Sequence, residues 1–111
     1  MNIASEQHLA AMVLRLDGEL TVDDSNNFKR SIREVTNNFA SDIIVDCTEL
    51  TQIDSVGLES LLWLSDETRS NASRLRLACV PQTISNVFRL TRLDGSFSAH
   101  QSVEEAARSL S

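Results

Sequence analysis

The segment DIIVDCTELTQIDSVGLESLLWL, residues 42–64, contains the transition on which the fold depends. Its apolar run Ile43–Cys47 is interrupted only by Asp46, and such a run predicts a strand that is covered on both faces. A polar turn follows this strand, and a helical spacing of apolar residues begins after Gly57. The segment therefore predicts a central strand, a tight connection and a helix that begins at or near Ser55.

The flanking sequence continues this alternation of strands and helices. Apolar spacing and turn signals predict a strand at residues 12–16, a turn at Asp17–Gly18, a short strand at 19–22 and a helix ending near Phe39. The helix that begins near Ser55 is expected to extend to about Asn71, with Leu58, Leu61, Leu62 and Ser65 on its buried face. The later segments predict a strand at 75–80, a helix around 84–91, a short strand near Phe97 and a last helix at 103–110. The order β-β-α-β-α-β-α-β-α is typical of an α/β fold with a mixed sheet of about four or five strands and about four helices. We expect one domain over residues 1–111, with its core at about 9–110.

Composition and charge exclude several classes of protein. The chain has 111 residues, a formal net charge of -6 and no run of Lys and Arg, so nucleic acid is not an expected partner. Because no stretch of about 18 apolar residues occurs, we expect no direct membrane insertion and a cytoplasmic location. Cys47 and Cys79 lie in separate apolar runs without CxxC spacing, which predicts two reduced, buried thiols and no metal site.

The common catalytic motifs are absent from the sequence. Gly18, Gly57 and Gly95 are far apart, so they form no phosphate-binding loop. The two histidines, His8 and His100, have no Ser or Cys partner at a motif spacing, so a hydrolytic triad is not expected. These observations predict a protein that is not an enzyme and needs no cofactor.

The loop Asp54–Leu58 is the remaining candidate for chemistry. Ser55 lies where the helix begins, and the unpaired N–H groups and partial positive charge of a helix N-terminus favour a phosphate there. Gly57 reduces bulk, which would let another chain approach the backbone. The alternative is that Ser55 is only the helix N-cap and Asp54 only a turn residue, because Ser and Asp are common in both positions.

The segment IVDCTELTQIDSVGLESLLWL, residues 44–64, resembles the signature of the STAS domain of bacterial anti-sigma-factor antagonists. In that family a hydrophobic strand leads into an apolar-Asp-Ser-x-Gly-Leu loop and a Leu-rich helix. The opening LRLDGELTVDDSNNFKRSI, residues 14–32, resembles the family's first strand and first helix. Pro81, the helix around Ile84 to Phe88 and Leu93–Asp94 resemble its later half, so the likeness extends over residues 14–97.

The resemblance implies a protein-binding switch controlled by phosphorylation. By position, Ser55 would be the phosphoacceptor, and the partner-binding surface would comprise Ile53, Asp54, Ser55, Val56, Gly57, Leu58, Glu59 and Trp63. The implied partners are an anti-sigma factor that is a serine kinase of the histidine-kinase-like ATPase type and a PP2C-type phosphatase. The unmodified form would bind the kinase and so release a sigma factor or other regulator, and phosphorylation would reverse this.

Alternatives remain open for the function and for several side chains. The same fold could be a constitutive subunit of a larger assembly, such as a lipid-transport ABC complex. A third class, a small enzyme or nucleotide-binding module, stays open because STAS domains have been linked to nucleotide binding, although no motif here supports it. Trp63 lies about 100° around the helix from the core stripe, which indicates either partial burial at the sheet edge or an aromatic anchor at a partner interface. The hydroxyls of Ser60, Ser65 and Thr68 are interpreted as facing solvent.

Overall fold

The computed structural model describes residues 1–111. Five strands form one sheet in the order β1-β2-β3-β4-β5. The elements in chain order are β1 Asn2–His8, β2 Ala11–Leu20, the 3-10 helix η1 Val22–Asp24, α1 Ser25–Val35, β3 Asp42–Ile53, α2 Ser55–Ser70, β4 Leu75–Ala78, α3 Gln82–Leu90, β5 Ala99–His100 and α4 Val103–Ser109. The predicted α/β class and the alternating pattern of strands and helices are confirmed, although the first two predicted strands both fall on β2.

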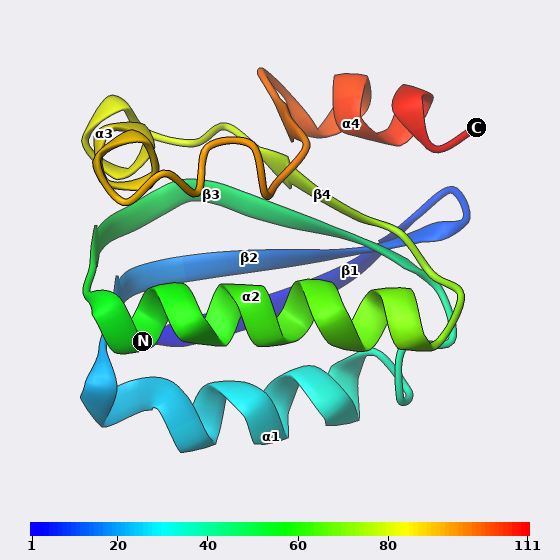
Figure 1. Ribbon diagram of the computed structural model, residues 1–111. Helices are drawn as coiled ribbons and strands as arrows, with labels where there is room; N and C mark the ends of the chain where they lie inside the picture. Colours follow the sequence, from blue (N-terminus) through cyan, green and yellow to red (C-terminus); the bar gives the residue numbers. More distant parts are fainter.

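The sheet is mixed and is covered by helices on both faces. β1 pairs antiparallel with β2, whereas β2, β3, β4 and β5 pair as parallel strands. Figure 1 shows α1 and α2 side by side on one face of the sheet and α4 on the other. The larger apolar cluster contains the buried apolar side chains of α1, α2 and α3. A smaller cluster of mostly small residues packs α4 against β2, β3 and β4. None of the helices has the length and apolar character needed to cross a membrane.

The N-terminal hairpin differs from the prediction. Its turn lies at Leu9–Ala10, and β2 continues through Asp17–Gly18 without reversing direction. Gly18 has a φ of 113° and lies where the register of β2 against β3 shifts, so this glycine belongs to a bulge and not to a turn. The strand β1 is absent from the sequence prediction because most of its side chains are exposed and show no apolar alternation.

The boundaries of β3 and α1 also differ from those predicted. β3 continues without a turn to Ile53, so the whole connection between this strand and α2 is the single residue Asp54. α1 ends at Val35, and the following residues Asn37, Asn38 and Phe39 all have positive φ angles. Phe39 is nevertheless buried, because its ring packs against Trp63 of α2 and belongs to the larger apolar cluster.

The two cysteines lie in different environments. Cys47 and Cys79 are both free thiols, but only Cys47 is buried. Burial in the core, followed by the negative charges of Asp46 and of Cys79 when it is ionised, raises the pKa of the Cys47 thiol to about 12. The prediction of a buried thiol is therefore confirmed for Cys47 and wrong for Cys79, which is partly exposed beside the Gln101 carbonyl oxygen.

Candidate functional site

The junction between β3 and α2 lies where the carboxyl ends of the parallel strands β2 and β3 meet (Figure 1). Asp54 has an extended backbone, with φ of -105° and ψ of -174°, and the helix begins at the next residue, Ser55. The backbone N–H of Asp54 donates to the carbonyl oxygen of Leu20 at 3.3 Å. The start of α2 is therefore attached directly to the end of β2.

The carboxylate of Asp54 caps α2 and also holds the neighbouring loop. One oxygen accepts a hydrogen bond from the N–H of Gly57 at 2.8 Å, and the other accepts one from the N–H of Val22 at 3.0 Å. The Gly57 bond favours the ionised form and, together with the Val22 bond, outweighs the opposing effect of desolvation, so the pKa of Asp54 lies below its ordinary value. A single side chain thus joins the N-terminus of α2 to the connection between β2 and α1.

Ser55 is the first residue of α2, and its side chain is exposed. The hypothesis that Ser55 is the N-cap and Asp54 only a turn residue is wrong, because the capping oxygen belongs to Asp54. The Ser55 hydroxyl is consequently not required to satisfy the helix N-terminus. Sequence patterns do not distinguish two adjacent capping residues, since the choice depends on where the Val22 and Gly57 amides lie.

Gly57 is required by a contact within this chain. A Cβ atom at this position would lie 2.1 Å from the carbonyl oxygen of Leu20 and 2.8 Å from Cγ1 of Ile53. Gly57 is buried. Its small size is therefore explained by the close approach of Leu20 and Ile53 and not by access for another chain. The close approach lets α2 begin directly against the end of β2.

The predicted partner-binding residues differ widely in exposure. Ile53 and Leu58 are only 7% and 6% exposed, and Val56 is partly buried. The side chains of Ser55 and Glu59 are both exposed. The structure brings Ile53 to Glu59 together at one end of the sheet, but only the two exposed side chains present much of their surface to solvent. Leu62 and Asp66 continue the same face of α2, because residues seven and eleven positions after Ser55 lie on one side of a helix.

Several predictions for the rest of α2 are corrected by its packing. The buried face contains Ser60 and Thr68, whose hydroxyls donate to the carbonyl oxygens of Val56 and Ser65. They were expected to face solvent, but each satisfies its polar group within the helix and can therefore be buried. The buried stripe includes Leu64 in place of the partly exposed Leu62 and Ser65.

Trp63 lies about 12 Å from Ser55 along the axis of α2. Its ring is directed toward α1. Its ring meets Phe39 edge to face at 5.9 Å between centroids, and Lys29 and Arg33 of α1 lie 5.7 and 5.1 Å from the ring centroid. The predicted partial burial is confirmed, although it occurs at the helix pair and not at a sheet edge. This tryptophan is thus already engaged by α1.

A second group of polar side chains lies near the C-terminus of the chain. The Ser98 hydroxyl is 3.3 Å from Nε2 of His100, and Nδ1 of the same ring is 3.4 Å from a carboxylate oxygen of Glu105. Sequence spacing did not indicate the Ser98 contact, because two residues of separation match no triad motif. Both separations are at the long end of hydrogen bonding, and the contacts join β5 to the first turn of α4.

Comparisons with known proteins agree with this architecture. The family model of the STAS domain matches residues 2–106. A Thermotoga maritima protein assigned as an anti-sigma factor antagonist has a TM-score of 0.88 at 18% identity, with 96% of this chain and 92% of that chain covered. Unphosphorylated SpoIIAA, a Bacillus anti-sigma factor antagonist, has a TM-score of 0.72 at 24% identity, with 97% and 96% covered.

The fold also occurs within much longer proteins. In the murine anion transporter Slc26a9, the matching region has a TM-score of 0.74 at 16% identity and covers 92% of this chain but 18% of the transporter. These structural likenesses, all below 25% identity, show a common fold. The family match extends over nearly the entire sequence and includes the junction of Asp54 and Ser55. This chain belongs to the STAS domain family.

Proposed function

We propose that this protein is a phosphorylation-controlled binding switch of the anti-sigma-factor-antagonist type, with Ser55 as the phosphoacceptor. The observation that carries the proposal is the division of roles between Asp54 and Ser55. Asp54 supplies the helix cap, and Ser55 is exposed in the first turn, so a kinase can modify the hydroxyl without removing a capping group. Membership of the STAS family and the overall likeness to SpoIIAA support the same proposal.

The charge at this site provides a physical mechanism for the switch. A phosphate adds about -1.5 to -2 charges at pH 7. The helix N-terminus stabilises that charge, whereas Asp54 beside it and Glu59 one turn later repel it. A partner that contacts unmodified Ser55 through an apolar patch or a carboxylate would be released on phosphorylation. In this proposal the unmodified form binds and the phosphorylated form dissociates.

The proposed partners follow from this mechanism and from the family. One is an anti-sigma factor that is also a serine kinase of the histidine-kinase-like ATPase type, and the other is a PP2C-type phosphatase that restores the hydroxyl. The protein itself acts by binding and not by catalysis, and the exchange takes place in the bacterial cytoplasm. The exposed face with Ser55, Glu59, Leu62 and Asp66 is the proposed contact with the kinase.

A binding experiment with matched variants tests this proposal. Wild type, Ser55→Ala and Ser55→Asp are used to retain the kinase from lysates of the native host, and Ser25→Ala at the start of α1 is the control. We expect wild type, Ser55→Ala and the control to retain the same partner, and Ser55→Asp to lose it. Equal recovery with all four proteins would instead support a constitutive assembly subunit.

A further inference from the structure

A second site candidate lies about 21 Å from Ser55, at the other end of α2. A pocket of about 260 Å³ opens between the last turns of this helix, the first half of β4 and the loop before β5. Its lining includes the guanidinium-bearing residues Arg69, Arg74 and Arg76 and the hydroxyl-bearing residues Ser65, Thr68, Ser73 and Ser96. This concentration of positive charge contrasts with the net charge of -6 for the whole chain.

The backbone of β4 contributes a hydrogen-bond donor to this pocket. The amides of Leu77 and Cys79 donate toward β5, to the carbonyl oxygens of Ser98 and His100. Amide direction alternates along a strand, so the N–H of Leu75 points the same way. β5 pairs only with residues 77 and 78 of β4, so no strand lies opposite Leu75. Its N–H therefore faces the open edge beside the pocket.

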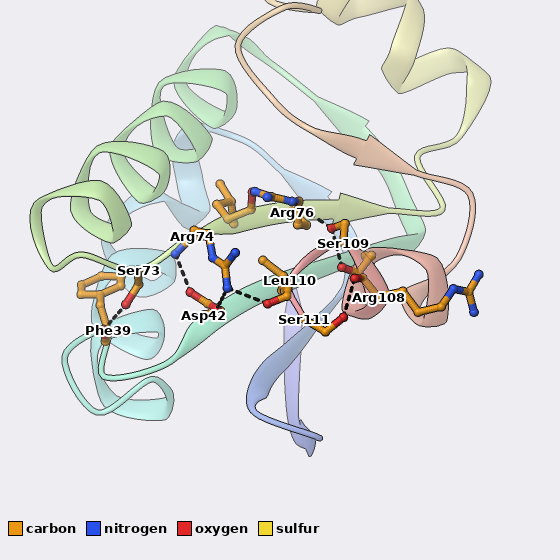
Figure 2. Close-up of polar contacts among 11 residues, drawn as sticks. Phe39, Asp42, Ser73, Arg74, Arg76, Arg108, Ser109, Leu110 and Ser111 are labelled. Atoms are coloured by element: carbon orange, nitrogen blue, oxygen red, sulfur yellow. Dashed lines mark hydrogen bonds and ion pairs between the residues drawn. The ribbon is translucent and has the colours of Figure 1, made fainter.

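The three arginines differ in how far their charge is already neutralised. Arg74 forms an ion pair with Asp42 at 2.9 Å and also donates to the Leu110 carbonyl oxygen (Figure 2). Arg76 has no carboxylate partner. Its hydrogen bonds go to the Ser109 hydroxyl (Figure 2) and to the Leu75 carbonyl oxygen. These bonds use Nε and one hydrogen of Nη1, which leaves donors of the fork free.

Arg69 is held only by long contacts, to the Ser65 hydroxyl at 3.5 Å and to Asp66. Its contact with Asp66 is 3.7 Å long, and both side chains are about three-quarters exposed, at 76% and 74%. An exposed pair of this kind contributes little free energy, so Arg69 can turn toward an anion at small cost. Arg69 and Arg76 are thus the two cations that remain available to a ligand.

The hydroxyl groups narrow the donor set further. Thr68 and Ser73 donate to the carbonyl oxygens of Ser65 and Phe39, so neither has a proton left for a ligand. Ser96 is exposed at the rim of the pocket. The available donors are therefore Arg69, Arg76, the Leu75 amide, Ser96 and Ser65, whose hydroxyl accepts a long bond from Arg69 and keeps its own proton. No carboxylate lines the pocket.

We propose that this pocket binds the phosphate group of a small phosphorylated molecule. Two guanidinium forks match the charge of a phosphate dianion and can each donate to two of its oxygens. The volume is below that of most pockets for drug-sized ligands, which are about 300 Å³ or larger, and suits a phosphate or diphosphate group. The site is independent of the proposed switch at Ser55.

Titration of the full chain with inorganic pyrophosphate, followed by ¹H–¹⁵N spectra at low ionic strength, tests the proposal. Saturable shifts are expected at the amides of Leu75, Arg76 and Ser96. Arg76→Ala should weaken the affinity by about tenfold or more, because it removes a charge-assisted fork. Arg76→Lys should recover only part of this loss, since lysine keeps the charge but not the fork. Exposed Arg108 of α4 supplies the control, and Arg108→Ala should bind as wild type does.

Arg69→Ala is the second variant, because this exposed side chain is not part of the core and its loss leaves the fold intact. It should weaken pyrophosphate binding with unchanged thermal stability. A peptide that contains phosphoserine, added in a parallel titration, should bind more weakly than pyrophosphate. The proposal is overturned if pyrophosphate causes no saturable shifts, if Arg69→Ala and Arg76→Ala bind as wild type does, if Arg108→Ala has the same effect as Arg76→Ala, or if the phosphopeptide binds more tightly.

Discussion

The starts of α1 and α2 contain the same dipeptide, Asp-Ser, in two different geometries. Asp54 has an extended backbone and its carboxylate accepts the N–H of Gly57, whereas Asp24 has a helical backbone and forms no capping hydrogen bond. The Asp24 carboxylate instead accepts the hydroxyl of Thr21 at 3.3 Å. The Asp-Ser dipeptide alone therefore does not create the site. The site forms because β3 passes directly into α2, which places the Asp54 carboxylate beside the amides of Gly57 and Val22.

Gly57→Ala should have the largest effect, because it pushes the start of α2 away from β2. The added methyl group would lie 2.1 Å from a backbone oxygen that cannot rotate away. We expect a loss of about 3 kcal/mol in the free energy of unfolding, measured by urea denaturation. Gly95→Ala is the matched control, because its new Cβ would meet no atom within 4 Å. Similar losses for the two variants would contradict the tight junction.

Asp54→Ala against Asp24→Ala tests the comparison itself. Removing Asp54 leaves the amides of Gly57 and Val22 without their partner, so the melting temperature should fall by several degrees. Removing Asp24 breaks only long contacts and should lower stability by less than about 0.5 kcal/mol. If thermal melts gave equal losses, the two helix starts would be equivalent and the assigned cap would be wrong.

The stabilisation by Asp54 should also depend on pH. Its pKa in the folded protein is lowered, so the contribution is fully present above the unfolded-state pKa of about 3.9 and is lost as the pH falls through the folded-state value. The stability difference between wild type and Asp54→Ala should therefore be constant from about pH 7 to pH 5 and shrink below about pH 4. A difference that is unchanged down to pH 2 would show that the ionised carboxylate is not the stabilising group.

Ser55→Ala should have the smallest effect on stability, below about 0.5 kcal/mol, because the hydroxyl is exposed and caps nothing. Ser102 of α4 provides a positive control, since its side chain accepts the N–H of Glu105 at 3.0 Å as a true N-cap. Ser102→Ala should cost about 1 kcal/mol in the same urea titrations. An equal cost for Ser55→Ala would return the capping role to Ser55.

The predicted elements that were confirmed are those with strong apolar periodicity. α1, α2, α3 and α4 and the central part of β3 each have a buried stripe or run. β1 lacks such a pattern, because it is an edge strand with one neighbour and largely exposed side chains. The Asp17–Gly18 pair was predicted as a turn because local chemistry favours one, but pairing of β2 with β3 on both sides of the pair imposes a bulge.

The candidate site could be predicted only as a location. The pattern from Ile53 to Leu58 indicated a helix start with a serine, and the structure confirms that Ser55 is the first helical residue. The functions of Asp54 and Gly57 depend on a segment more than thirty residues earlier in the chain. Asp54 accepts a hydrogen bond from Val22 at the start of η1, and Gly57 lies close to Leu20 at the end of β2. Local sequence does not show these contacts, so it left open whether Asp54 or Ser55 caps the helix.

The most direct test of the central claim is phosphate mapping on the protein purified from its native host. Intact mass and phosphopeptide spectra are recorded for wild type, Ser55→Ala and Ser25→Ala across growth conditions. The proposed switch predicts one phosphate, at Ser55, that is absent from Ser55→Ala and retained in Ser25→Ala. No phosphate under any condition, or a phosphate at Ser25 in place of Ser55, would contradict it.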